Sequence, residues 1–426
     1  MTSLAVIGTG YVGLTTGVCF AHLGHDVFCA DIDADKVARL ERGESPIVEE
    51  RIEELIAEGL ESGRLRFTDS PVEAVRDCEI AFLCVPTPSM ADRSVDLAFV
   101  ESAVAMIADA LPPGAVVATK STVPVGSTLV VERTLGRHDV AVVSNPEFLR
   151  EGTAVHDFLT PDRVVIGSDD PAASERVAAL YECLGAPVVI TDPATAETVK
   201  YAANAFLATK LSFVNAIAAV CEAVGADVDD VMTSLGHDHR IGPDFLQPGP
   251  GWGGSCFPKD TQALLQISEE AGYPFRFLEG VLEVNAQQIE RVVAKVESAV
   301  GGSLDAANVA VWGLTFKANT DDLRESPSLA VVRGLLSRGA RIRAWDPTVE
   351  ASRPPIPDDV EVCADPYVAC QDADAVVVLT EWAELEEVDA VKVAELVRRR
   401  AVVDARNILD RDAWRLAGFD HQGIGK

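Results

Sequence analysis

The chain has 426 residues, of which 48% are hydrophobic and 24% are charged, and its formal net charge is −31 at pH 7. This length predicts two or three domains, and the acidic surface would repel nucleic acid and anionic lipid, so an anionic ligand would need a local cationic pocket. The apolar runs fall far short of the roughly 20 residues of a membrane helix, so we expect a cytoplasmic protein with neither a membrane nor a nucleic-acid partner.

The first part of the chain alternates strand and helix patterns, which predicts an α/β fold with a doubly wound, mostly parallel sheet. Short apolar runs indicate the strands, and helical patterns lie between most of them. The expected strands are Leu4–Gly8, Asp26–Asp31, Ile80–Val85, Ala115–Lys120, Ala141–Ser144 and Val164–Ile166.

The middle of the chain has a helical pattern. Apolar residues recur at helical spacing from Thr195 to about Gly225, where a glycine ends the pattern, and again from Asp260 to about Val300. Strand and helix then alternate once more, which predicts a second, smaller α/β unit. Its expected elements are the strands Val309–Trp312, Arg341–Trp345 and Val376–Leu379 and a helix at Ser328–Arg338. We therefore predict three domains, at residues 1–195, 196–300 and 301–426.

A glycine-rich turn follows the first predicted strand. Gly8, Gly10 and Gly13 form a G-x-G-x-x-G pattern, and Asp31 ends the next strand about 20 residues later. In a Rossmann-like βαβ unit these glycines let the backbone approach a pyrophosphate, and the acidic residue binds the ribose hydroxyls. A carboxylate would repel the 2′-phosphate of NADP, so we predict NAD. Lys36 is the one nearby cation that favours NADP.

Two further loops follow strands of the same predicted sheet, at Cys84–Ser89 and Lys120–Ser127. Ligands of open α/β sheets bind beyond the carboxyl ends of the strands, so Thr87 and Thr122 are placed to line the cofactor cleft. Taken alone, either loop is more often ordinary turn chemistry.

Three polar residues stand out as a candidate reaction centre. Lys200 and Asn204 are four residues apart on the long predicted helix and therefore share one face, and Glu147 follows a strand and a proline. A solvated surface lysine and a helix-capping carboxylate are the alternative interpretations.

Nine cysteines are spread over the chain with no C-x-x-C pair and no zinc-like spacing, so we expect neither a disulfide scaffold nor a metal. Cys256 differs from the others because it lies in "GWGGSCFPKD", after glycines that would leave room for a substrate. A cation such as Lys200 or Lys259 would favour its thiolate. A buried hydrophobe and a nucleophile both remain open at this point.

Longer stretches complete the pattern: "GTGYVGL", "DIDADKV", "KSTVPVGS", "SNPEFLREG", "DFLTPDRVVIG", "KYAANAFLATKLSFVNAIA", "RIGPDFLQPGPGWGGSCFPKD" and "GLTFKANTDDLRESPS". In this order they resemble the motifs of the UDP-glucose/GDP-mannose dehydrogenase family. The resemblance runs from residue 4 to about residue 350, with a weaker match at "DARNILD".

The resemblance implies an enzyme that oxidises the C6 alcohol of a nucleotide sugar to a carboxylate, using two NAD+ in succession without releasing the aldehyde. It implies that Cys256 adds to the aldehyde, giving a thiohemiacetal and then a thioester that water hydrolyses. UDP-glucose, giving UDP-glucuronate, is the expected substrate, because Ser255 stands where enzymes for N-acetylated sugars tend to have histidine. GDP-mannose and UDP-N-acetylhexosamines are the alternatives.

The resemblance also assigns residues to the sites. The implied catalytic residues are Cys256, Lys200, Asn204, Asp260, Glu147 and Thr122, and which of them is the first general base stays open. The implied cofactor-binding residues are Gly8, Gly10, Tyr11, Val12, Gly13, Asp31, Lys36, Thr87, Thr122, Glu151 and Arg324. The implied substrate-binding residues are Glu147, Phe148, Leu149, Arg150, Lys200, Asn204, Arg240, Phe245, Gln247, Gly249, Gly253, Phe316, Lys317 and Arg406. Arg240 resembles an arginine that reaches the substrate of a neighbouring subunit, which implies a homodimer or a higher homo-oligomer.

The chain departs from the family's pattern at two places. It has "EERI" at Glu49–Ile52 where relatives often have Glu-Pro-Gly-Leu, and "DAR" where they have Asp-Gly-Arg. Alanine lacks the backbone freedom of glycine, which bears on the assignment of Arg406. A two-electron hydroxyacid dehydrogenase and an NAD-binding regulator without activity are the alternatives outside the family, and the second α/β domain speaks against the former.

Overall fold

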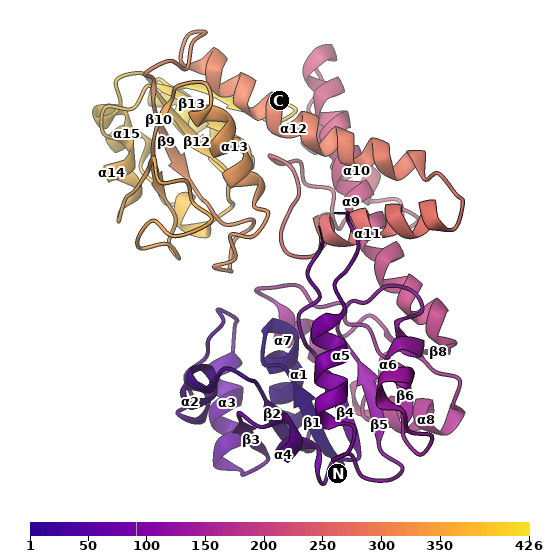
Figure 1. The fold of residues 1–426 in the computed structure, drawn as a ribbon. Coiled ribbons are helices and arrows are strands. Elements are labelled where there is room, and N and C mark those ends of the chain that lie inside the picture. The colour runs from indigo at the N-terminus through magenta and orange to yellow at the C-terminus, as the bar shows by residue number, and fades with distance from the viewer. Residues whose placement is uncertain (91) are drawn as a thin grey trace. The chain divides into compact units, whose positions relative to one another are not determined.

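The computed structural model describes residues 1–90 and 92–426. The chain divides into two compact units, Met1–Ala203 and Asn204–Lys426. The division falls inside the long helix α9 (Pro193–Val224), as Figure 1 shows. The predicted limits of three domains stay a prediction.

The first unit is built on one sheet of eight strands with the order β3-β2-β1-β4-β5-β6-β7-β8. Neighbouring strands pair in parallel except for β6 and β7, so the predicted doubly wound, mostly parallel sheet is confirmed. The strands are β1 (Ser3–Ile7), β2 (Asp26–Ala30), β3 (Leu65–Thr68), β4 (Ile80–Leu83), β5 (Val116–Thr119), β6 (Ala141–Ser144), β7 (Val164–Gly167) and β8 (Val188–Thr191).

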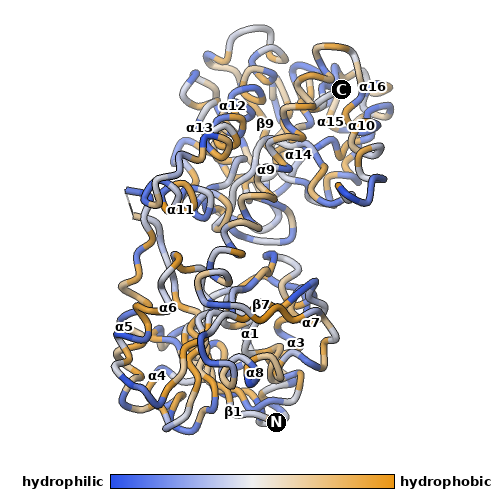
Figure 2. The backbone as a smooth tube through the Cα atoms, turned by 90° about the vertical axis from the view of Figure 1, so that its right-hand side faces the viewer, coloured by the Kyte–Doolittle hydropathy of each residue, from blue (hydrophilic) through white to orange (hydrophobic). Residues whose placement is uncertain are grey.

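Helices cover both faces of this sheet because successive strand side chains point to opposite sides. Leu4 and Val6 of β1 belong to one core and Ala5 and Ile7 to the other. Figure 2 shows hydrophobic strands in this unit. The first core includes residues of α1 (Tyr11–His22), α2 (Ala34–Glu41), α3 (Ile52–Glu61), α7 (Ala154–Leu159) and α8 (Pro171–Ala179). The second includes residues of α4 (Pro71–Val75), α5 (Ala98–Ile107) and α6 (Ser127–Leu135).

The second unit begins with helices. After the C-terminal part of α9 come α10 (Val228–Gly236), α11 (Phe257–Glu270) and α12 (Arg276–Ala299). The helical stretch predicted from Asp260 to Val300 is therefore two helices rather than one. Gly272 has a φ of +77° and Pro274 follows it, and these residues end α11 and separate it from α12.

A six-stranded parallel sheet forms the rest of the second unit, with the order β11-β10-β9-β12-β13-β14. One core joins its face to α9, α10, α12 and α13, so the helices and this sheet pack as one body. The strands are β9 (Asn308–Trp312), β10 (Arg341–Trp345), β11 (Val360–Val362), β12 (Ala375–Val378), β13 (Ala401–Asp404) and β14 (Asp420–Gly423). The helices are α13 (Pro327–Leu336), α14 (Pro366–Cys370), α15 (Ala390–Leu396) and α16 (Arg411–Leu416).

Among the described residues, α9 is the one helix that is long and apolar enough to cross a membrane by length and composition alone. A core helix of a protein that never meets a membrane passes the same test. The polar residues of α9 have partners in other elements: Lys200 bonds Glu147, Asn204 bonds Asp260, and Ser212 bonds the carbonyl oxygen of Val281. These contacts are those of a helix that packs within a protein.

Candidate active site

The glycine-rich turn between β1 and α1 has the geometry that its motif predicts. Gly8 has a φ of +96°, and a Cβ atom there would lie 2.6 Å from the carbonyl oxygen of Cys84. A Cβ on Gly13 would overlap the carbonyl oxygen of Gly8, so no larger residue fits at either position. Around Gly10 no atom lies within 4 Å of the Cβ position, and no side chain caps α1. The amides of this helix N-terminus are thus open to a phosphate group.

Asp31 lies at the end of β2, nearly buried, and its carboxylate is held in place. Its Oδ2 accepts hydrogen bonds from the amide and hydroxyl of Thr9, at 2.9 and 2.8 Å, and from the ammonium of Lys36 at 2.9 Å. Burial alone would raise the pKa of Asp31, but the bonds from Lys36 and Thr9 outweigh it and the pKa is lowered. Lys36 is therefore engaged by the same carboxylate that would bind a ribose, and it is not a separate site for a 2′-phosphate.

The loop after β6 carries Glu147 and is tied to the glycine-rich turn. The hydroxyl of Tyr11 bonds the carboxylate of Glu49, and the amide of Gly152 donates to both groups. Glu49 comes from "EERI", the stretch that departs from the family's pattern. Arg51, two residues after Glu49, has a left-handed φ of 65° and stands where the family's pattern has glycine.

Glu147 and Lys200 form a buried ion pair within the first unit. The Nζ of Lys200 lies 2.8 Å from Oε1 of Glu147, and the amide of Leu149 donates to Oε2 at 2.6 Å. The ring of Phe148 lies beside this pair, with Lys200 5.5 Å from its centroid and the guanidinium of Arg163 3.7 Å from it. The alternative of a solvated Lys200 is therefore wrong, because the side chain is inside the protein.

Asp260 is the centre of a second buried group, in the second unit. Its side chain is fully buried on the first turn of α11. The amide of Asn204 donates to Oδ2 at 2.6 Å, and the ammonium of Lys259 lies 2.7 Å from Oδ1. The backbone amide of Asp260 also bonds the carbonyl oxygen of Cys256 at 2.8 Å. A carboxylate so enclosed can hold or pass a proton without bulk water.

Cys256 differs from the other cysteines in where it lies. It is the N-cap residue of α11 and is partly accessible, with the hydroxyl of Ser255 3.5 Å from its sulfur. Seven of the other cysteines are buried, and burial raises the pKa of Cys84, for example, to about 12. A helix N-terminus favours a thiolate. All nine cysteines are free, and no group of three or more possible metal ligands is found within residues 1–90 and 92–426.

The glycines before Cys256 serve a different purpose from the one predicted. A Cβ on Gly253 would overlap the carbonyl oxygen of Glu325, and one on Gly254 would lie 2.8 Å from the ring of Phe316. The space beside them is thus filled by the segment that follows β9. These glycines let the Cys256 segment and the Phe316 segment approach each other within the second unit.

Arg406 fixes the same segment from the end of β13. Its Nε donates to the carbonyl oxygen of Leu379 at 2.8 Å and its Nη2 to that of Phe316 at 3.2 Å, and Glu381 lies 3.0 Å from Nε. Ala405 is not among the described residues with a positive φ, so the lack of a glycine there leaves the Arg406 backbone unaffected. Gly249 packs against this guanidinium, since its Cβ position lies 3.2 Å from Nη1.

Other predicted residues have different neighbours in the structure. Arg240 and Arg324 each fold back on the aspartate two residues earlier, with Nη2–Oδ2 distances of 2.5 and 2.7 Å. Arg150 forms an ion pair with Asp157, seven residues later, at 2.6 Å. The ring centroid of Phe245 lies 6.3 Å from that of Phe257, the residue after Cys256. Gln247 is exposed. Val12, Thr87, Thr122 and Glu151 are half-buried in the loops and helix around the glycine-rich turn.

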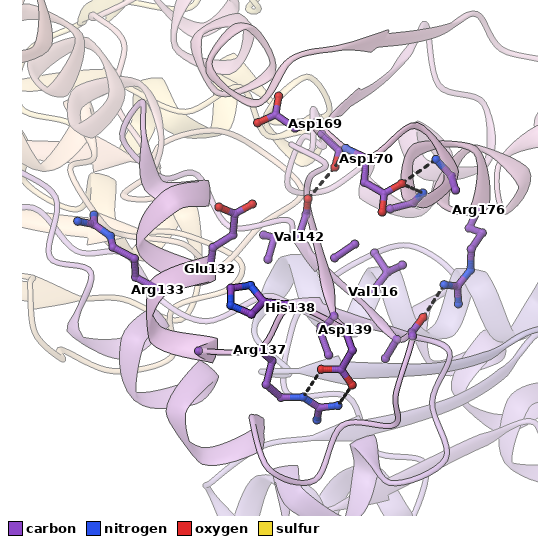
Figure 3. Close-up of a pocket in the computed structure, with 18 residues that line it drawn as sticks. Val116, Glu132, Arg133, Arg137, His138, Asp139, Val142, Asp169, Asp170 and Arg176 are labelled. Atoms are coloured by element: carbon purple, nitrogen blue, oxygen red, sulfur yellow. Dashed lines mark hydrogen bonds and ion pairs between the residues drawn. The ribbon is translucent and has the colours of Figure 1, made fainter.

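The first unit also has a surface cavity of about 720 Å³, shown in Figure 3. It lies where β5 and β6 begin, whereas the glycine-rich turn and Glu147 lie where strands end. Arg137 and Asp139 form an ion pair at this cavity, and Arg176 donates to the carbonyl oxygen of Gly114. None of the predicted site residues lines it, so it is not the candidate active site.

Comparison with known proteins then places the chain. The UDP-glucose/GDP-mannose dehydrogenase family matches in three parts: its NAD binding domain at residues 2–185, its central domain at 194–287 and its UDP binding domain at 310–411. The chain belongs to this family.

Individual members of the family match this chain over nearly its whole length. A UDP-glucose 6-dehydrogenase of Rhizobium meliloti (strain 1021) is 45% identical, over 99% of this chain and 99% of that protein. UDP-glucose 6-dehydrogenase TuaD of Bacillus subtilis (strain 168) is 43% identical, over 100% and 94%. The solved structure of a UDP-glucose dehydrogenase from the archaeon Pyrobaculum islandicum has a TM-score of 0.93 at 39% identity, over 100% and 98% of the two chains.

The residues present fit the NAD of this dehydrogenase family. The open N-terminus of α1 at Gly10 suits a pyrophosphate. Among the residues that the structure describes, Oδ1 of Asp31 accepts one bond, from the amide of Asp33 at 3.1 Å. That oxygen can still accept from a ribose hydroxyl. The expected cofactor is therefore supported by the family and by the side chains.

Sequence reasoning missed the residues that hold the site in shape. The side chain of Asn215 accepts a bond from the amide of Gly249 at 2.9 Å, and that of Gln288 donates to its carbonyl oxygen at 2.7 Å. Asn285 accepts a bond from the amide of Trp252 and donates to its carbonyl oxygen. Glu197 accepts bonds from Gly126, in the loop that carries Thr122, and from Thr128, in the first turn of α6. The available signal was a buried polar side chain on an apolar helix face, which helical periodicity alone does not separate from a solvated one.

Proposed function

We propose that the protein is a UDP-glucose 6-dehydrogenase that converts UDP-glucose to UDP-glucuronate with two NAD+. The observation that carries the proposal is the accessible Cys256 at the start of α11, one turn from the buried Asp260 and its partners Asn204 and Lys259. Relatives named UDP-glucose 6-dehydrogenase support the substrate. A GDP-mannose or UDP-N-acetylhexosamine 6-dehydrogenase is the alternative.

In the first oxidation the C6 hydroxyl loses a proton and its carbon loses a hydride. A bound NAD+ at the N-terminus of α1 and Asp31 would supply the hydride acceptor. Lys200, Asp260 and Glu147 are the candidate bases, each of them buried and hydrogen-bonded. The amide of Asn204, which donates to Asp260, is a candidate donor to the negative charge that develops on oxygen.

In the second oxidation the aldehyde needs a nucleophile before it can lose a hydride. The thiolate of Cys256 forms a carbon–sulfur bond, and the carbonyl oxygen takes a proton, which gives a thiohemiacetal. Loss of a second hydride and of that proton gives a thioester. Water then adds, the carbon–sulfur bond breaks, and the carboxylate leaves with the thiol restored. Glu147 and Thr122 are proposed to handle this water.

The nucleotide end of the substrate needs cations. Lys317 lies on the segment that Arg406 fixes through the carbonyl oxygen of Phe316. We assign phosphate binding to Lys317 and the shape of its segment to Arg406, and the family's UDP binding domain covers both.

We also propose a cytoplasmic homodimer. Phe206, Phe213 and Val220 recur every seven residues along α9 in the second unit, and each is more than half exposed. An apolar stripe of this spacing is suited to a second copy of the same helix. A Phe213→Glu variant that keeps the mass of the wild type in light scattering would contradict this arrangement.

Nine free cysteines support the reducing compartment of the proposed cytoplasmic location.

The function is tested by following NADH absorbance with a panel of nucleotide sugars. Two NADH per UDP-glucose are expected, whereas one NADH, or activity with GDP-mannose alone, would refute the proposal. Cys256→Ser should abolish UDP-glucuronate formation and leave NAD binding intact. Cys183→Ser is the matched control, because Cys183 is exposed on a short helical turn, Glu182–Leu184, and has no proposed role.

A further inference from the structure

Lys120 is a buried cation that the proposed mechanism does not use. It follows β5 directly, is 4% exposed, and donates to neutral oxygens, Oδ1 of Asn145 at 3.3 Å and the hydroxyl of Tyr181 at 3.1 Å. The rings of Phe82, Phe158 and Tyr181 surround its Nζ, with centroids at 6.0, 5.8 and 5.5 Å. Within residues 1–90 and 92–426 it forms no ion pair. A buried charge without a counter-charge is costly, so its retention needs an explanation.

The hydrogen bonds of this cluster join two loops of the candidate site. The hydroxyl of Tyr181 donates to Oδ1 of Asn145 at 2.7 Å, and Nδ2 of Asn145 donates to the carbonyl oxygen of Val165 at 2.9 Å. Lys120 precedes Thr122 by two residues, and Asn145 precedes Glu147 by two residues. Two Cα–Cα steps span at most about 7 Å, so the Lys120 ammonium lies close to the backbone of the Glu147 loop.

The charge of Lys120 reaches the same region as that of Glu147. Burial raises the pKa of the Cys84 thiol, Lys120 acts to lower it and Glu147 acts to raise it, so both charges act on one sulfur atom. Tyr181, whose pKa is raised by burial, and Arg163, whose pKa is lowered by burial, also belong to this region. Lys200 is the partner of Glu147.

We propose that Lys120 is a positioning residue that supplies a fixed positive charge to the Glu147–Lys200 pair. When Lys200 gives up its proton, Glu147 is left as a buried carboxylate that has lost the charge of its ion-pair partner. Lys120 lowers that penalty, and it therefore favours the basic form of whichever of these two residues takes the proton. The inference rests on the proposed function, because it assigns Lys120 a part in that reaction.

The pH profile of kcat/KM with UDP-glucose tests the role. Lys120→Gln keeps a hydrogen-bond donor and removes the charge, so its acid limb should move to higher pH by about one unit. Lys120→Arg should keep the wild-type limb. Tyr181→Phe is the matched control, since it removes a hydrogen bond of the cluster and keeps the charge. Asn145→Asp gives Lys120 a counter-charge at the same position, and it should move the limb in the same direction even where Lys120→Gln does not fold.

An active wild type whose acid limb is unchanged in Lys120→Gln or in Asn145→Asp would overturn the role of Lys120 and leave the proposed function standing. An equal shift in Tyr181→Phe would overturn it as well, because the effect would then come from lost packing. A wild type that forms no NADH with UDP-glucose would overturn both.

Discussion

Gly253→Ala tests whether the glycines before Cys256 serve close packing. The added Cβ would overlap the carbonyl oxygen of Glu325 and would lie 2.9 Å from Cδ of Pro327. Backbone must therefore move, and overpacking of this kind costs about 1–3 kcal/mol. Each kcal/mol lowers Tm by about 2–4 °C in a domain of 150–250 residues, so the unit Asn204–Lys426 should melt about 2–12 °C lower.

The same variant should raise the KM for UDP-glucose, because the displaced segment carries Phe316 and Lys317. Gly280→Ala on α12 is the matched control: no atom lies within 4 Å of its Cβ position, and the change should stabilise the helix by about 0.5–1 kcal/mol. Calorimetry and steady-state kinetics on both variants decide the question. A Gly253→Ala protein with the Tm and KM of the wild type would refute the packing argument.

Two further predictions concern stability. Arg51 has a φ of 65°, so Arg51→Gly should raise the free energy of unfolding of the first unit by up to about 1 kcal/mol, measured by thermal melting; an unchanged Tm would contradict the assigned strain. His421 is buried, and burial with the charges of Arg411 and Arg415 lowers its pKa to about 4. Because the fold disfavours the protonated ring, stability should be full above the unfolded pKa of about 6.5 and fall as the pH drops from there toward 4. His421→Gln should flatten that part of the stability profile, and a wild-type slope in the variant would show that another group is responsible.

Most of the strands that the sequence revealed are buried over nearly their whole length, but β10 (Arg341–Trp345) is partly exposed, and the fully buried β13 was missed. Ile80–Leu83 is wholly apolar, and Val116–Thr119 is apolar up to its last residue; the structure places both runs in the middle of the sheet. Five strands went unnamed: β3, β8, β11, β13 and β14. The edge strands β8 and β14 show the reason, since β8 is mostly exposed and β14 reads Asp-His-Gln-Gly. An edge strand has one hydrogen-bonded neighbour and little to bury, so its composition approaches that of a loop.

The site was predictable as a set of residues and not as a set of contacts. Helical spacing places Lys200 and Asn204 on one face, yet the first bonds Glu147 and the second bonds Asp260, 53 and 56 residues away in the chain. Periodicity has no access to such distances, because they depend on where loops return after whole domains have folded. The family's motifs identify the residues, and the structure shows the two separate pairs that they form.

The acidic composition takes on a specific meaning beside these pairings. A carboxylate lies within 3 Å of the ammonium group of Lys36, Lys200 and Lys259. Arg240 and Arg324 each form an ion pair with the aspartate two residues earlier. A ligand phosphate that recruited Arg240 or Arg324 would have to displace an aspartate from an exposed arginine, and exposed ion pairs are weak in water. The Lys200–Glu147 pair is buried on both sides and cannot exchange so easily, since separating it leaves a charge in the interior. The exposed arginines can therefore change partners, whereas Lys200 keeps its counter-charge beside it.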